Sequence, residues 1–163
     1  MRGIRRSKSH SALADMLVTK NPKTGHAVFP SKKALQCYAA VLGFEMGERL
    51  PLPKGELDSI EWHTFDNDDY TDYIYLVALG ETKDLNVLRY DVENSDVEGD
   101  TEDMVTIFEE YANAGFEILS NWVLKTPSDP FGAKAIVAGL QRNDFLNLRK
   151  NENEAQTFDK VEF

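Results

Sequence analysis

The chain has 163 residues, of which 42% are hydrophobic and 28% charged, a balance typical of a globular protein and not of a disordered one. This length suits one domain with a real core, and no apolar run approaches the roughly 18 residues that a membrane helix needs. Cys37 is the only cysteine, which excludes an intrachain disulfide and a cysteine-based zinc site. We expect a buried core thiol in a cytoplasmic protein without a membrane partner.

The net charge of −10 is distributed unevenly. Residues 1–40 carry a net charge of +7 and the remainder −17. The basic residues of the first part are Arg2, Arg5, Arg6, Lys8, Lys20, Lys23, Lys32 and Lys33. An asymmetric protein of this kind can present a cationic face to phosphates and an acidic face to protein partners or metal ions. The alternative is that both regions are ordinary solvated surface.

The chain divides into a flexible basic arm (1–10), a single globular domain (11–150) and a polar tail (151–163). Leu13, Met16 and Leu17 share one face of a short helix predicted for 11–20. Ser31 is the expected N-cap of a second helix, because its hydroxyl can accept from a free amide of the first turn. The apolar face of that helix consists of Leu35, Tyr38, Ala39 and Leu42, and Gly43 is expected to end it.

The middle of the chain predicts one β element and one helix. Pro51 and Pro53 exclude a helix, and "SIEWHTF" alternates, so a hairpin is expected from residues 46–51 and 59–65. A helix from about 69 to 79 follows. Asp68 or Asp69 is its expected cap, Tyr73, Leu76 and Val77 form its apolar side, and Gly80 ends it.

The second half predicts further helices. Residues 91–103 form an acidic exposed loop, and a helix begins near Asp100 or Thr101. Its apolar register continues across Gly115, which predicts either a break there or the close approach of another backbone. One or two helices over 131–150 complete the domain. The predicted fold is mainly α (α+β), a compact single-domain helical fold with a small β-hairpin.

Motifs for catalysis are scarce. The sequence has no P-loop and no G-x-S-x-G elbow, and two acidic loops lack the glycine that an EF-hand requires. His63 is a candidate general base, but no orienting partner is visible, which favours a structural role. The catalytic residues stay unassigned. One candidate set resembles the PD-(D/E)xK nucleases, in which carboxylates hold Mg²⁺ or Mn²⁺ and a lysine steadies the attacking water. That set consists of Asp69, Asp72, Glu81 and Lys83, with Asp68 nearby.

The basic residues are the stronger candidates for a site. Arg5, Arg6 and Lys8 can follow DNA phosphates, and Lys32 and Lys33 lie in the first turn of a helix, which is itself an anion site. Aromatic residues do not alternate with these basic residues, so contact with the DNA backbone is expected and not base stacking. This prediction requires the basic side chains to lie on one side and to be free of carboxylate partners.

Four blocks of the sequence resemble a known family, the small proteins associated with bacterial DNA phosphorothioation (Dnd) genes and the SspB component of the Ssp system. They are an "IRR" start at residues 4–6, "AAVLGF" at 39–44, "ALGETKDLNVL" at 78–88 and "FEEYANAGFEIL" at 108–119. Ala114 departs from the "ANGG" of the family pattern. The blocks span most of residues 4–120.

The resemblance implies a role in replacing a non-bridging phosphate oxygen of DNA with sulfur, as part of anti-phage restriction. It implies work alongside a cysteine desulfurase and an ATPase, and SspB-like members are associated with nicking of DNA. No catalytic residue can be carried over from the family. The leading hypothesis is therefore a DNA-binding subunit that also nicks DNA. The alternative is a non-enzymatic acidic adaptor that bridges other proteins of the modification complex.

Overall fold

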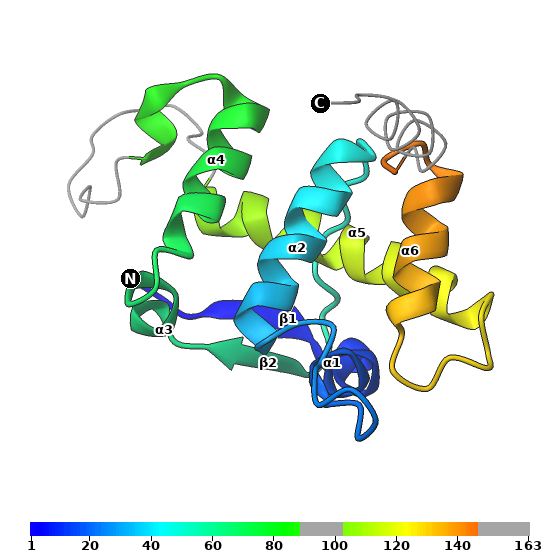
Figure 1. Cartoon of the computed structure of the whole chain (residues 1–163). Coiled ribbons are helices and arrows are strands. Elements are labelled where there is room, and N and C mark those ends of the chain that lie inside the picture. Colours follow the sequence, from blue (N-terminus) through cyan, green and yellow to red (C-terminus); the bar gives the residue numbers. More distant parts are fainter. Residues whose placement is uncertain (89–102, 147–163) are drawn as a thin grey trace, which may run out of the picture.

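The computed structural model describes residues 1–88 and 103–146. In chain order its elements are β1 (Ile4–Ser7), the 3-10 helix η1 (Lys8–His10), α1 (Ser11–Val18), α2 (Lys32–Glu45), β2 (Leu57–Ile60), α3 (Trp62–Asp66), α4 (Thr71–Thr82), the 3-10 helix η2 (Leu85–Leu88), α5 (Met104–Leu124) and α6 (Ala133–Arg142). Helix α2 crosses the long helix α5, α4 and α6 flank α2 on opposite sides, and the small sheet lies near the N-terminal end of α2 (Figure 1). The predicted class, mainly α with a small β element, is confirmed.

Helix α5 forms the centre of the molecule, and most of its residues are buried. A Cβ added at Gly115 would collide with the carbonyl oxygen of Ala39 in α2, and one added at Gly43 would collide with the carbonyl oxygen of Tyr111. The two glycines therefore let the α2 and α5 backbones touch. Of the two alternatives for Gly115, the close approach is confirmed, because α5 runs through this position without a break.

Two apolar clusters fill the space on either side of this crossing. One joins α4, α3 and β1 to the first half of α5 through side chains such as Phe65, Ile74 and Phe108. The other joins α1, α2 and α6 to the second half of α5, with Phe116 and Trp122 as large members. Burial of each large apolar side chain contributes roughly 1.5–3 kcal/mol, so these two clusters are the main stabilising contacts of the helices that carry the charged residues.

The predicted hairpin between residues 46–51 and 59–65 is wrong, because the strands that pair are different ones. Strand β1 pairs antiparallel with β2, in a register that runs from Ile4 opposite Ile60 to Ser7 opposite Leu57. Residues 46–51 form no strand, and residues 62–66 are helical, because Phe65 turns inward as a buried member of the first cluster. The N-terminal segment supplies the missing strand. The expectation of a flexible arm does not hold for residues 4–10, since Ile4 is completely buried.

Two helices run past the glycines that were expected to end them. Helix α2 continues through Gly43 to Glu45, and the left-handed residue that follows is Gly47, with φ of 67°. Helix α4 continues through Gly80, where a side chain would collide with the ring of Phe44. Both glycines serve close packing and not chain reversal.

The ends of α4 and α5 also differ from expectation. No side chain caps α4, which begins after Tyr70, so neither Asp68 nor Asp69 is its cap. Helix α5 begins at Met104, and the Asp103 carboxylate accepts from the amide of Val105 at 3.1 Å. The Ser31 cap is confirmed, with its hydroxyl 3.2 Å from the amide of Ala34. The predicted acidic loop, apart from Asp103, and the polar tail lie outside the described residues.

Candidate functional site

The first basic residues of the chain converge on one buried acid. Glu109, in α5, is only 1% exposed, and its carboxylate accepts from the guanidinium groups of both Arg2 (2.5 Å) and Arg5 (2.8 Å). It also accepts from the backbone amide of Arg5 at 2.6 Å, which ties strand β1 to the helix. Arg2 reaches Asp103 as well, at 3.1 Å. A buried carboxylate needs such partners, because desolvation of an unpaired charge is costly.

The remaining basic residues of this region also have carboxylate partners. Arg6 is buried, donates to Asp58 at 2.8 Å and lies 5.8 Å from the centre of the Phe116 ring. Further ion pairs join Lys8 to Glu56 (3.1 Å), Lys32 to Asp15 (2.6 Å) and Lys33 to Asp68. Lys33 also donates to the carbonyl of Thr64 at 2.8 Å. Within the described part of the chain, six of the eight predicted DNA-binding residues are thus paired with acids.

Lys20 and Lys23 differ from the other six. Both are exposed in the segment between α1 and α2, and neither has an ion-pair partner in residues 1–88 or 103–146. They are the part of the predicted phosphate-binding set whose charge is not offset locally. The intramolecular pairs remove most of the free positive charge that the DNA prediction requires.

The nuclease-like candidates lie at opposite ends of α4. Asp69 and Asp72 are at its N-terminal end, whereas Glu81 and Lys83 are at or just beyond its last turn. Asp72 and Glu81 are nine positions apart in the helix, about 13.5 Å along its axis. Metal ligands must converge within a few ångströms, so these four residues do not fit a shared Mg²⁺ or Mn²⁺ ion. In the described ranges, no three His, Cys, Asp or Glu side chains are grouped as a metal site.

Glu81 makes two contacts that hold α4 to its neighbours. Tyr111 of α5 donates its hydroxyl to Glu81 at 2.5 Å, and Arg49 donates at 3.1 Å. The Tyr111 hydrogen bond has the largest effect and lowers the pKa of Glu81 from its ordinary 4.5. Burial is next and opposes this shift, and the hydrogen bond and charge of Arg49 make smaller contributions that lower the pKa further. His63, the candidate base, is exposed on the short helix α3 and not on a strand.

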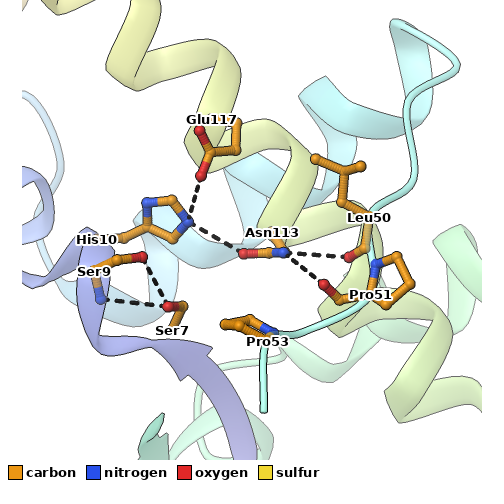
Figure 2. Close-up of a pocket in the computed structure, with 8 residues that line it drawn as sticks. All are labelled: Ser7, Ser9, His10, Leu50, Pro51, Pro53, Asn113 and Glu117. Carbon is orange, nitrogen blue, oxygen red and sulfur yellow. Dashed lines mark hydrogen bonds and ion pairs between the residues drawn. The ribbon is translucent and has the colours of Figure 1, made fainter. Parts of the chain in front are cut away.

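A cavity of about 490 Å³ brings together polar side chains from separate parts of the chain (Figure 2). Its lining consists of Ser7, Ser9, His10, Leu50, Pro51, Pro53, Asn113 and Glu117. His10 is buried and stacks on the ring of Phe116, with the ring centres 5.2 Å apart. Its Nε2 lies 3.1 Å from Asn113 Oδ1 and 3.5 Å from Glu117 Oε1.

The bonds of Asn113 determine the role of His10. The Asn113 amide nitrogen is close to the carbonyl oxygens of Leu50 (3.3 Å) and Pro51 (3.0 Å), so it is the donor to both. Asn113 Oδ1 is therefore an acceptor, and His10 Nε2 must carry the proton that it receives. The hydroxyls of Ser7 and Ser9 bond each other at 2.8 Å and not the imidazole. The cluster joins η1, α5 and the 50–53 segment, and it does not pair a serine with a base.

Sequence reasoning missed this cluster and the role of Glu109. The signal was present in spacing: Glu109, Asn113 and Glu117 recur every four residues in "FEEYANAGFEIL" and so share one side of the helix. That side faces β1 and η1, where Arg5 and His10 lie. Polar residues at helical spacing inside an apolar pattern indicate a polar partner across the interface.

The outward side of α4 combines apolar and acidic residues. Tyr73 and Leu76 are exposed there, although they were expected to face the core; the buried side consists of Thr71, Ile74, Val77 and Ala78. Residues 61–88, which include α4, contain seven acids and one lysine, a net charge of −6. The acids Asp66, Asp69, Asp72 and Asp84 are exposed and have no basic partner among the described residues.

The four sequence blocks meet around α5. The "IRR" strand contacts Glu109, "LGF" contributes Gly43 and Phe44 against Tyr111, and "ET" contributes Glu81 to the same tyrosine. The residues of the blocks that carry the family resemblance therefore make contacts that hold the fold together. No helix in the described ranges has the length and apolar character needed to cross a membrane.

The fold and these contacts define a small α+β protein built around one buried helix. The sequence model of the family described as DNA sulphur modification system-associated protein 4 matches residues 3–160, so the chain belongs to that family. The resemblance to Dnd-associated small proteins is confirmed. No curated protein and no solved structure matches the chain significantly.

Proposed function

We propose that this protein is a non-enzymatic adaptor of a DNA sulphur modification system and that it binds a basic protein partner. The family places it with such a system. The charge distribution after folding supports the adaptor role. The basic residues near the N-terminus are mostly offset by internal carboxylates. Residues 61–88 have a net charge of −6 along the sequence. Two of their acids, Asp68 and Glu81, pair with Lys33 and Arg49, but Asp66, Asp69, Asp72 and Asp84 have no basic partner among the described residues.

Electrostatics favours this partner over a nucleic acid. A net charge of −10 repels the phosphate backbone at long range, and local ion pairs leave few cations to overcome that repulsion. The same charge attracts a basic protein surface and speeds its association at low salt. Proteins that handle DNA commonly carry such basic surfaces. The expected partners are therefore other proteins of the modification system.

Binding to purified proteins of the same system tests the proposal. The cysteine desulfurase and the ATPase are titrated separately with this protein, and Kd is measured by calorimetry at low and high salt. Binding to one of them should weaken with salt and weaken about tenfold in Asp72→Lys, a loss of about 1.4 kcal/mol. The matched control is Asp144→Lys, an exposed acid that follows α6, on the far side of α2 from α4 (Figure 1). Equal losses in both variants would argue against the α4 region.

A second candidate function is DNA binding with nicking, as in SspB-like members of the resembled family. Lys20 and Lys23 support it, because they are exposed and have no carboxylate partner among the described residues. The surface pair of Lys8 with Glu56 is partly exposed and contributes little to stability, so a phosphate can compete for Lys8.

Two assays test this second function. If Lys20 and Lys23 contact phosphates, a Lys20→Ala/Lys23→Ala variant should lower the slope of log affinity against log salt by about 2. Nicking is measured as relaxation of supercoiled plasmid in Mg²⁺ or Mn²⁺, for wild type, Glu81→Ala and Asp69→Ala. Relaxation by wild type and by both variants would place the nicking site outside the nuclease-like set, as the separation of these residues along α4 predicts. No DNA binding at physiological salt would leave the adaptor as the sole proposal.

A further inference from the structure

Helix α4 is apolar on two opposite sides. Its inner side packs Ile74, Val77 and Ala78 into the first cluster. On its outer side Leu76 is 65% exposed and Tyr73 is 42% exposed. A helix that is apolar all round is normally buried all round, whereas a helix at the surface of a monomer shows a polar outer face. The outer side of α4 is therefore exposed, although its apolar composition is typical of a surface that another element covers.

The exposed apolar surface extends beyond the helix. Leu85, in η2, is 75% exposed, and η2 packs directly against α4. Tyr73 and Leu76 are three residues apart, so they lie next to each other on the helix surface. Tyr70 stacks on Tyr73, with the ring centres 6.0 Å apart, and holds that side chain in place. We name the exposed apolar residues Tyr73 and Leu76 of α4, together with Leu85 of the adjacent η2, the α4 ridge.

Acidic residues surround the α4 ridge. Asp72 lies one helical turn before Leu76, Asp69 lies in the turn that precedes α4, and Asp84 directly precedes Leu85. All three carboxylates are exposed and lack a basic partner within residues 1–88 and 103–146. The rim also contains one exposed base, Lys83, so its charge is mainly but not entirely negative. Apolar surface with a charged rim is typical of a recognition site.

We infer that the α4 ridge is the docking surface for a cationic amphipathic segment of a partner protein. This inference rests on the proposed adaptor function and names the surface that performs it. Apolar side chains of the segment cover Tyr73, Leu76 and Leu85, while its lysines and arginines face Asp69, Asp72 and Asp84. An amphipathic helix with apolar anchors at positions i, i+3, i+4 and i+7 has the required pattern.

The negative charge around the α4 ridge favours a basic protein segment over a second copy of the chain, the chain's own residues 89–102 or DNA. A second copy of the chain, docked through the same surface, would place two acidic rims against each other, which is repulsive. The chain's own residues 89–102 contain six acids and one arginine and would be repelled by the rim. DNA would be repelled for the same reason. A basic protein segment alone complements both the apolar centre and the acidic edge.

A matched pair of substitutions tests the ridge. Leu76→Gln removes the central anchor and keeps a good helix former, and Leu124→Gln makes the same change at a leucine that is 73% exposed at the end of α5. Affinity for the protein of the modification system that binds wild type should fall at least tenfold in Leu76→Gln and less than twofold in Leu124→Gln. Equal affinities of wild type and Leu76→Gln would overturn the inference and leave the adaptor function standing.

A peptide probe separates the two proposals. A synthetic 18-residue helix of leucines at i, i+3, i+4 and i+7 with lysines elsewhere is titrated into the isotope-labelled protein and followed by NMR. The control peptide has serine in place of leucine. Leucine-dependent shifts confined to α4 and η2 support the ridge, even when no protein of the system binds and the adaptor function fails. Shifts spread over the surface, equal for both peptides, or absent would overturn the ridge.

Discussion

On the polar side of α5 a charged group is buried and paired, whereas on the outer side of α4 the acids are exposed and unpaired within the described residues. On α5, Glu109 is almost completely buried and has two arginine partners, and Asn113 satisfies both His10 and two backbone carbonyls. On α4, apolar side chains are exposed and the neighbouring acids have no basic partner in the described ranges. The difference indicates that the polar groups of α5 hold the fold together, whereas the outer side of α4 is the surface for which we propose a partner.

This comparison changes the meaning of the basic N-terminal residues. A sum over residues 1–40 gives +7, which alone suggests a phosphate-binding region. Folding brings distant acids to six of those eight residues, including Glu109, more than a hundred positions away from Arg2 and Arg5. Charge summed along a sequence therefore overstates the charge available at a surface.

The largest expected effect is at the crossing of α2 and α5. Gly115→Ala places a methyl group against the backbone carbonyl of Ala39, and neither backbone can move without repacking both clusters. We expect a loss of about 3 kcal/mol or more in the free energy of unfolding, measured by urea denaturation. The control is Gly55→Ala, where the added Cβ meets nothing within 4 Å. A loss below about 1 kcal/mol at Gly115 would contradict the close approach.

The buried acid comes next. Glu109→Gln keeps the shape of the side chain but leaves Arg2 and Arg5 facing a neutral group, so we expect a loss of about 2–3 kcal/mol. Glu61→Gln, at an exposed acid, should change stability by less than about 0.5 kcal/mol. Equal effects of the two substitutions would contradict the contrast between the buried, paired acid of α5 and an exposed acid of residues 61–88. Urea denaturation of both variants at one pH makes the measurement.

Removal of one hydroxyl should have a smaller effect. Tyr111→Phe deletes the hydrogen bond to Glu81, with an expected loss of about 1 kcal/mol at neutral pH. That bond lowers the pKa of Glu81 below 4.5, so its stabilising effect is present above pH 4.5 and is lost as the pH falls through the folded-state pKa. The difference between wild type and variant should therefore shrink in acid. A difference that grows as the pH falls would contradict the assignment.

The smallest expected signal concerns Cys37, which lies in the first core cluster. Burial raises the pKa of its thiol to about 12, with a lesser opposing effect of Lys33. The reactive thiolate is therefore scarce at pH 8, and a thiol reagent should label the folded protein slowly. Labelling should become rapid in denaturant. Equally rapid labelling of the folded protein would show that this part of the core is open.

Local rules predicted the parts of the fold that depend on neighbours in sequence. The Ser31 cap follows from one side chain. At Gly115 the missing side chain indicated either a close backbone approach or a helix break, and the structure shows the close approach. The pairing of β1 with β2 could not be predicted in this way, since its strands are about fifty residues apart. Tyr73 and Leu76 were assigned to the core side of α4 because both sides of this helix are apolar, and the structure shows them exposed. The candidate catalytic residues Asp69, Asp72, Glu81 and Lys83 were grouped because they are close in sequence, whereas the structure separates them along the axis of α4.

The central claim is that a protein partner binds at α4. Charge reversal on α4 and in the segment between α1 and α2 tests this claim most directly. Wild type, Asp72→Lys and Lys23→Glu are titrated against the cysteine desulfurase and the ATPase by calorimetry at physiological salt. The account predicts that one of these proteins binds wild type, that Kd rises about tenfold for Asp72→Lys, and that Kd stays within twofold for Lys23→Glu. A large rise for Lys23→Glu with no change for Asp72→Lys would contradict it.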